Sequence, residues 1–216
     1  IYPWRTAYGS DPNCHSVFVK ATSGEYEAWA ESSPLCFGPL YLPETATSAF
    51  YNITEFFASH VVGLDYDTAS DLNQRLQIFK GNNFAKAAIE MSWWSLRSTM
   101  TEIPLHRLLG GQSREVEVGA DFGIQDSIDM LLGNIQNAVE SNSLRVKLKI
   151  SKGWDLDVLR AVRNAFPNII LHIDCNAGYT LDDLPFFKAI DDMNLAFIEQ
   201  PLQYFDVLDH AKLARQ

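Results

Sequence analysis

The sequence is poor in cysteine, basic residues and long apolar runs, and each shortage excludes a class of protein. Its three cysteines, Cys14, Cys36 and Cys175, form no CxxC pair, so neither a disulfide framework nor a zinc site is indicated and a reducing, cytoplasmic setting fits best. The 17 basic residues stand against 27 acidic ones, which argues against nucleic acid as a partner because phosphates require a basic surface. No apolar stretch approaches the roughly 20 residues of a membrane span, and no signal-peptide pattern opens the sequence.

What remains is an ordinary globular composition, with 216 residues of which 47% are hydrophobic and 20% charged. This length allows one large or two small domains with a real core. Residues 1 to about 65 are predicted to be extended strands and loops. A short strand is expected over 16–20 and a second over 24–32, where small and polar residues alternate as in a strand meander. Proline, glycine, serine and threonine over 33–48 indicate a loop.

Helices are expected next, followed by a change of rhythm. A first helix is predicted from a cap at Asp67 or Thr68 to Gly81. A second, with the alanines and tryptophans of a buried helix, is predicted over 84–100. The pair Gly110-Gly111 then marks a candidate domain boundary.

From residue 115 onwards, strands and helices alternate. Strands centre near Val118, Leu148, Leu171 and Phe197, and helices are expected over 127–140, 155–165, 181–190 and 205–215. Such βα units with apolar strands predict a parallel sheet. A spacing of roughly 25–30 residues per unit matches a (β/α) barrel, of which the 216 residues hold about four units.

The most informative segment is the apolar run 145–150, because two lysines interrupt it. Lys147 and Lys149 lie two residues apart, so on a strand they share one face while the apolar residues share the other. Two ammonium groups on one face repel each other, and we therefore expect at least one of the lysine pKa values to fall. A lysine that is partly neutral near pH 7 can act as a general base.

Two carboxylates complete the candidate site, since Asp174 and Glu199 each end a later apolar run. In βα barrels the active site lies at the carboxyl ends of the strands, where these residues are expected. Carboxylate oxygens favour Mg²⁺ over zinc. A divalent ion holding a substrate carboxylate would stabilise the charge that develops when a lysine removes the α-proton. The predicted reaction is therefore proton abstraction beside a carboxylate, through an enediolate intermediate.

These motifs, KxK, DxN and EQP in order, resemble the enolase superfamily in its muconate-lactonizing subgroup, and are most similar to its o-succinylbenzoate synthase / N-succinylamino acid racemase branch. The resemblance rests on Val146–Ile150 with Gly153–Asp155, Asp174–Leu181, Phe197–Leu202, Gly81–Met91 and Leu108–Gly111. It implies an α+β capping domain over 1–111, followed over 112–216 by the first half of a (β/α)7β TIM-type barrel.

The resemblance also assigns roles within the barrel segment. Lys149 would be the acid/base that moves the α-proton, and Lys147 would assist through charge and hydrogen bonding. Asp174 and Glu199 would ligate Mg²⁺, with Asn176 beside them as a substrate-binding residue. The third carboxylate ligand is expected beyond residue 216, so the sequence is expected to be truncated and its metal site incomplete.

In the capping domain, the resemblance implies specificity loops at 5–9 and 33–41, where Tyr8 and Tyr41 would contact the substrate. That substrate would be a small-molecule carboxylate. The activity would be syn dehydration to o-succinylbenzoate on the menaquinone pathway, racemization of N-succinylamino acids, or both. Dipeptide epimerization, cycloisomerization and a truncated, non-catalytic family member stay open as alternatives. Members of the family often form homo-oligomers, which makes self-association a further expectation.

Overall fold

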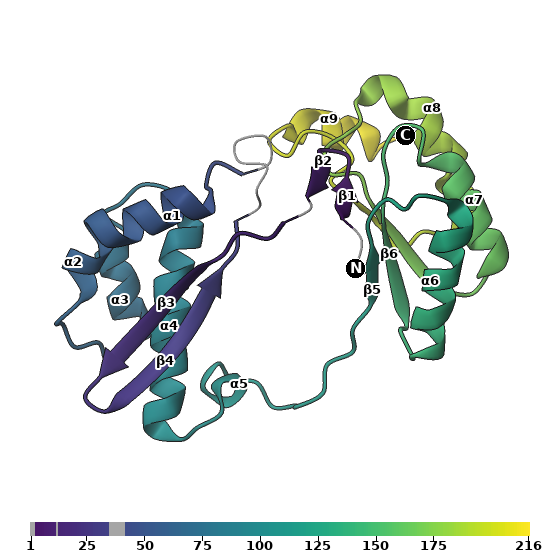
Figure 1. Ribbon diagram of the computed structural model, residues 1–216. Helices are drawn as coiled ribbons and strands as arrows, with labels where there is room; N and C mark the ends of the chain where they lie inside the picture. Colours follow the sequence, from purple (N-terminus) through teal and green to yellow (C-terminus); the bar gives the residue numbers. More distant parts are fainter. Residues whose placement is uncertain (1–2, 12, 35–41) are drawn as a thin grey trace. The chain divides into compact units, whose positions relative to one another are not determined.

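The structure, a computed structural model, describes residues 3–11, 13–34 and 42–216 (Figure 1). Contacts within the chain divide it into two compact units. One, here called the cap unit, is Asn13–Glu115; the other, the barrel unit, joins Ile1–Pro12 to Val116–Gln216. In the described part of the chain, no helix is both long and apolar enough to cross a membrane.

An antiparallel hairpin packed on a long helix forms the centre of the cap unit. Strands β3 (Val17–Ser23) and β4 (Tyr26–Ser32) pair along their whole length, and both contact α4 (Asn83–Thr101). The predicted strands and the predicted helix over 84–100 are thereby confirmed. Alternation on the strands buries Val17 and Ala28 and leaves the other face in solvent.

The expectation of extended and loop structure up to residue 65 is wrong. Residues 46–61 form a nearly continuous helix, made of α1 (Ala46–Asn52), the π-helical η2 (Ile53–Phe57) and α2 (Ala58–Val61). Thr45 starts it with a capping box, in which its side chain accepts from the Ser48 N–H and the Ser48 hydroxyl accepts from the Thr45 N–H. Ala49 and Phe57, eight residues apart, lie buried on one side, so burial of this face outweighs the weak helix propensity of the aromatic and β-branched residues between them.

Helix α3 (Ala69–Leu76) begins at Thr68 as predicted but ends five residues before Gly81. The reason is that Phe79 turns inward, where its ring lies 4.4 Å from that of Phe57. The Lys86 ammonium donates to the Phe79 carbonyl at 2.7 Å and fixes this turn. The short α5 (Leu105–Leu108) follows α4.

The barrel unit contains the predicted parallel sheet, whose strand order is β5-β6-β7-β8 (Figure 1). The strands are β5 (Ala120–Phe122), β6 (Arg145–Lys149), β7 (Ile170–Asp174) and β8 (Ile198–Glu199). Helices α6 (Ile128–Glu140), α7 (Leu156–Ala165), α8 (Leu184–Ala189) and α9 (Val207–Leu213) follow them in turn, with the 3₁₀ turns η3 (Leu181–Asp183) and η4 (Asp191–Met193) before and after α8. Sheet and helices share one core of buried, mostly aliphatic residues.

The first predicted strand is displaced along the chain. Val118, its expected centre, is 69% exposed and lies outside any strand. Pairing begins only at Ala120, which lies opposite Val146. An alternating apolar and acidic pattern is therefore insufficient for a strand here, because no described strand pairs with residues 115–119.

A small hairpin near the N-terminus also belongs to the barrel unit. Strands β1 (Trp4–Thr6) and β2 (Gly9–Asp11) pair antiparallel. The Ile124 N–H, just after β5, donates to the Arg5 carbonyl at 2.9 Å. This hydrogen bond places the hairpin at the carboxyl end of the parallel sheet.

Candidate active site

The register of the parallel sheet brings the predicted residues together. Lys149 lies opposite Asp174 on the neighbouring strand, and Asp174 lies opposite Glu199 on the next. The intervening residues of β6, Val146 and Leu148, point to the other face and are buried in the helix-covered core. Strand alternation thus separates an apolar face from a charged one, as the sequence predicts.

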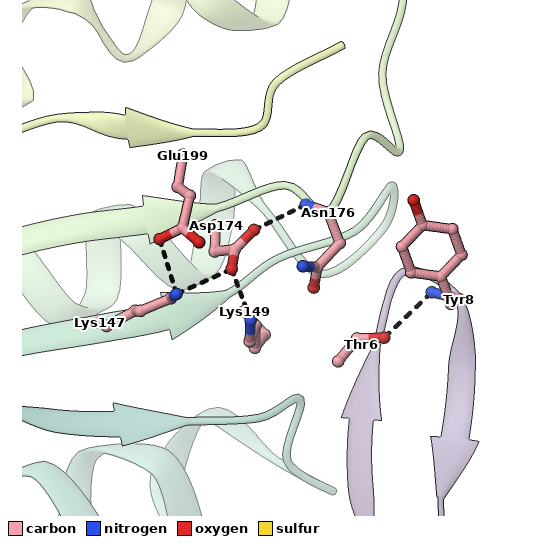
Figure 2. Close-up of polar contacts among 7 residues, drawn as sticks. All are labelled: Thr6, Tyr8, Lys147, Lys149, Asp174, Asn176 and Glu199. Atoms are coloured by element: carbon pink, nitrogen blue, oxygen red, sulfur yellow. Dashed lines mark hydrogen bonds and ion pairs between the residues drawn. The ribbon is translucent and has the colours of Figure 1, made fainter. Parts of the chain in front are cut away.

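On the charged face, ion pairs link the two lysines to both carboxylates (Figure 2). The Lys149 Nζ lies 2.5 Å from Asp174 Oδ2. The Lys147 Nζ lies 2.9 Å from the same oxygen and 2.7 Å from Glu199 Oε2. Lys149 and Asp174 are buried, while Lys147 and Glu199 are partly exposed. The ammonium of Lys147 therefore bridges two carboxylates from adjacent strand ends.

The lowered pKa expected for at least one of the two lysines is not found at Lys147. Burial opposes its charged form, but hydrogen bonds to Glu199 and Asp174 outweigh that effect and raise the pKa of Lys147. Burial likewise acts to raise the pKa of Asp174, yet its hydrogen bonds to Lys149 and Lys147 leave that pKa lowered. Repulsion between neighbouring lysines is thus outweighed at Lys147 by carboxylates that two later strands supply.

Beyond β7 the chain turns sharply at Asn176. Its backbone has φ 44°, in the left-handed region that asparagine tolerates better than most residues. Its N–H donates to Asp174 Oδ1 at 2.9 Å, which fixes the second oxygen of that carboxylate. The buried Asn176 Oδ1 has no hydrogen-bond partner among the residues that the structure describes. An amide oxygen able to accept from a ligand thus stands beside the carboxylates.

The open side of the sheet forms a cavity of about 350 Å³. Its lining consists of Gly119, Ala120, Asp121, Arg145, Lys147, His172, Phe197 and Glu199. The buried His172 ring stacks on Phe197 with centroids 4.2 Å apart, and burial, followed by the nearby charge of Lys147, lowers the pKa of His172. His172 precedes Asp174 by two residues on β7 and so shares its face, whereas its aromatic partner Phe197 comes from a later segment.

Of the two candidate tyrosines, Tyr8 belongs to the described residues and Tyr41 does not. Tyr8 lies in the turn of the β1–β2 hairpin, where its N–H donates to Thr6 Oγ1 at 3.2 Å. In Figure 2 the hairpin lies beside the loop that carries Asn176. Tyr41 lies outside the described residues. Their roles as substrate-binding residues stay predictions.

Oxygen donors that could hold a hard cation are Asp174, Glu199 and the Asn176 amide. Over the described ranges, no group of three or more histidine, cysteine, aspartate or glutamate side chains is placed to hold a metal ion. The metal-ligand assignments therefore stay predictions as well.

A parallel βα sheet with lysines and carboxylates at its strand ends, preceded by an α+β unit, defines a class of capped barrel enzymes. The chain belongs to the enolase superfamily: residues 1–110 match the N-terminal domain of the mandelate racemase / muconate lactonizing enzyme family, and residues 132–216 match the enolase C-terminal domain-like family. These matches confirm the predicted fold class.

Two relatives carry the names of the branch that the motifs resemble. The chain is 43% identical to an N-succinylamino acid racemase of Thermus thermophilus, over 82% of this chain and 48% of that protein. It is 36% identical to an o-succinylbenzoate synthase of Geobacillus kaustophilus, over 98% and 56%. The crystal structure of an enolase-superfamily member from Enterococcus faecalis matches 99% of this chain and 58% of that one, with TM-score 0.86 and 32% identity. The chain thus spans about half the length of these relatives.

Proposed function

We propose that the protein removes a proton next to a carboxylate in a Mg²⁺-dependent reaction, as an o-succinylbenzoate synthase, an N-succinylamino acid racemase or both. The observation that carries the proposal is the cluster of two lysines within 2.5–2.9 Å of two strand-end carboxylates. Relatives bearing these two names support the choice of substrate class. The substrate would be a small-molecule carboxylate.

In this proposal Lys149 is the base and Lys147 its electrostatic partner. Lys149 is buried beside Asp174, so water is largely excluded from the group that must receive the proton. The raised pKa of Lys147 keeps that ammonium charged, which suits it to contact the substrate carboxylate. Tyr8, Tyr41 and Asn176 are proposed to bind the rest of the substrate.

We propose that Asp174, Glu199 and Asn176 supply oxygen ligands for a magnesium ion. Lys147 already holds a positive charge between Asp174 Oδ2 and Glu199 Oε2, so both oxygens face one position that favours a cation. The unpartnered Asn176 Oδ1 adds a neutral oxygen nearby. Hard oxygen donors of this kind suit Mg²⁺. When bound, Mg²⁺ would supply charge stabilisation as the α-proton leaves.

Dehydration and racemization share the first proton transfer and diverge afterwards. In dehydration, the proton returns to the departing hydroxide, and the reaction is a step on the menaquinone pathway. In racemization, the proton is exchanged between opposite faces of the α-carbon. A cytoplasmic location and self-association stay predictions. Dipeptide epimerization, cycloisomerization and a non-catalytic role are the alternatives to this proposal.

The intact mass of the protein is first compared with the 24.3 kDa of these 216 residues. The test then measures exchange of the α-proton of an N-succinylamino acid in deuterated water. We expect exchange that EDTA abolishes and Mg²⁺ restores. Lys149→Ala should slow it by about 10²–10⁴-fold, the usual contribution of a general base. Lys20→Ala, which removes an exposed lysine of β3, should leave it unchanged.

Two outcomes would count against the proposal. Exchange that survives Lys149→Ala would show that another group is the base. Wild-type protein that exchanges nothing with Mg²⁺, while its circular dichroism shows a folded chain, would favour the alternatives over the proposed activity. Dehydration assays on the same samples then distinguish the synthase from the racemase.

A further inference from the structure

The β1–β2 hairpin lies very close to the loop that follows β5. A Cβ placed on Gly123 would lie 3.0 Å from the Arg5 carbonyl oxygen and 3.2 Å from the Arg5 nitrogen. These are backbone atoms, which cannot rotate away as a side chain does. The adjacent Ile124 N–H donates to the same Arg5 oxygen, and the Arg5 guanidinium pairs with Asp126. The absence of a side chain at Gly123 thus permits direct backbone docking.

A second close approach occurs at the loop that follows β7. A Cβ placed on Gly178 would lie 3.0 Å from Ala7 Cβ, in the turn of the hairpin, and 3.0 Å from the Cys175 carbonyl oxygen. Neither Gly178 nor Gly123 has a positive φ. A positive φ therefore does not account for glycine at these positions. Close contacts do: with the hairpin at Gly123, and with both the hairpin and the Cys175 carbonyl of its own loop at Gly178.

We propose that Gly123 and Gly178 are positioning residues that seat the Trp4–Asp11 hairpin on the barrel unit and so set the acyl-group preference of the active site. The proposal rests on the function proposed above. The hairpin turn carries Tyr8 between two loops that the glycines anchor, and one of these loops also carries Asn176 two residues from Gly178. A methyl group at Gly178 would push the turn away from the loop that holds Asn176 by a few tenths of an ångström, and one at Gly123 would push Arg5 away from the loop that follows β5.

The expected functional effect is selective. Lys149 and Asp174 are held by the sheet register, which the hairpin does not contribute to. Chemistry at the α-carbon should therefore be preserved when the hairpin shifts, whereas binding of the remote acyl group should weaken. Small displacements of positioning elements can change rates by up to about 100-fold. We expect a KM for N-succinylphenylalanine raised about 5–20-fold and a kcat within about 3-fold of wild type, in that same range.

Docking itself has a readout that is independent of activity. The Ile124 amide is protected from hydrogen exchange only while it donates to Arg5, so its exchange rate reports the docked hairpin. Gly123→Ala and Gly178→Ala should each accelerate this exchange by about 10-fold or more, as local opening becomes easier. Gly133→Ala is the matched control, because a Cβ at this exposed position on α6 meets nothing within 4 Å.

A rescue variant separates positioning from a general loss of stability. Ala7→Gly removes the methyl group that the new side chain of Gly178→Ala would meet. The double variant should recover part of the Ile124 protection and part of the wild-type KM, because the Cys175 carbonyl oxygen still lies close to the new methyl group. Unchanged Ile124 exchange in both single variants, or equal loss of kcat and of protection in Gly133→Ala, would overturn the proposal. If wild-type protein shows Ile124 protection that the glycine variants lose but no α-proton exchange, the seating stands and the proposed function fails.

Discussion

Two lysines on two different sheets form ion pairs of the same length in opposite surroundings. In the cap unit, Lys20 Nζ lies 2.5 Å from Glu27 Oε2, with 38% and 57% of the two side chains exposed. In the barrel unit, Lys149 Nζ also lies 2.5 Å from its partner, Asp174, but the exposures are 9% and 1%. Distance alone therefore does not distinguish a surface pair from a site that can do chemistry.

The difference lies in what each pair loses when one partner is removed. Water re-solvates an exposed charge, so pairs such as Lys20–Glu27 contribute little. A buried charge left alone is strongly unfavourable, because the surroundings cannot replace its partner. In the barrel unit the buried charges share their partners, since the Asp174 carboxylate accepts from both Lys149 and Lys147. Such a cluster is stable only as a whole, whereas the cap pair is dispensable.

The largest effect that tests this comparison should come from Asp174→Ala. The change leaves Lys149 buried without its partner and removes one of the two carboxylates that bridge to Lys147. Breaking a buried pair in this way costs about 3–5 kcal/mol. Urea unfolding followed by circular dichroism measures the change in free energy of unfolding.

The matched control is Glu27→Ala, which breaks the pair of equal length in the cap unit. With both side chains more than one-third exposed, solvent screening limits its cost to about 0–1 kcal/mol. Equal losses in the two variants would contradict the view that burial, rather than geometry, separates the pairs.

A buried carboxylate in the cap unit provides the second test, because it is stabilised without any lysine. Glu44 is buried, and its two oxygens accept from the N–H groups of Phe84 at 3.0 Å and Ala85 at 3.1 Å, in the first turn of α4. Helix N-termini leave such donors unpaired, and their dipole favours a negative charge. Glu44→Ala should cost about 1.5–3 kcal/mol, the range for hydrogen bonds to a charged group, measured by the same urea titration.

Glu44→Gln serves as the control for charge. It keeps an oxygen that accepts one of the two N–H groups, so its loss should be about half that of the alanine variant. A glutamine variant as unstable as the alanine variant would show that the negative charge of Glu44 at the N-terminus of α4, and not its hydrogen bonds, accounts for the effect.

Prediction from sequence succeeded where one periodic pattern determined the structure. Strands β6 and β7 combine a fully buried face with a charged one, so alternation alone located Lys147, Lys149 and Asp174 on a shared side. The helix 46–61 was missed because its aromatic and β-branched residues have low helix propensity, and its signal was the capping pair Thr45 and Ser48.

Other features depend on residues far apart in the chain and could not be found from local patterns. The raised pKa of Lys147 follows from Glu199, 52 residues later, lying 2.7 Å away. Docking of the hairpin on Gly123 likewise joins Arg5 to a loop more than a hundred residues away. Only the register of the sheet and the close approach of two backbones reveal such contacts.

The smallest effect is expected for Asp183, whose ion pair is intermediate in exposure between the Lys20–Glu27 and Lys149–Asp174 pairs. Lys152 Nζ lies 2.8 Å from Asp183 Oδ1, with side chains 59% and 20% exposed. The Lys152 hydrogen bond, together with those from Thr180, lowers the pKa of Asp183. A carboxyl with a lowered folded-state pKa stabilises the fold above its unfolded pKa of about 4, and loses this contribution as the pH falls through the folded value.

Asp183→Asn should therefore reduce the free energy of unfolding by no more than about 1 kcal/mol at pH 7, after allowance for solvent screening. Its difference from wild type should vanish near pH 2 and shrink in about 1 M salt. A difference that is constant from pH 7 to pH 2 would show that the charge of Asp183 contributes nothing to stability.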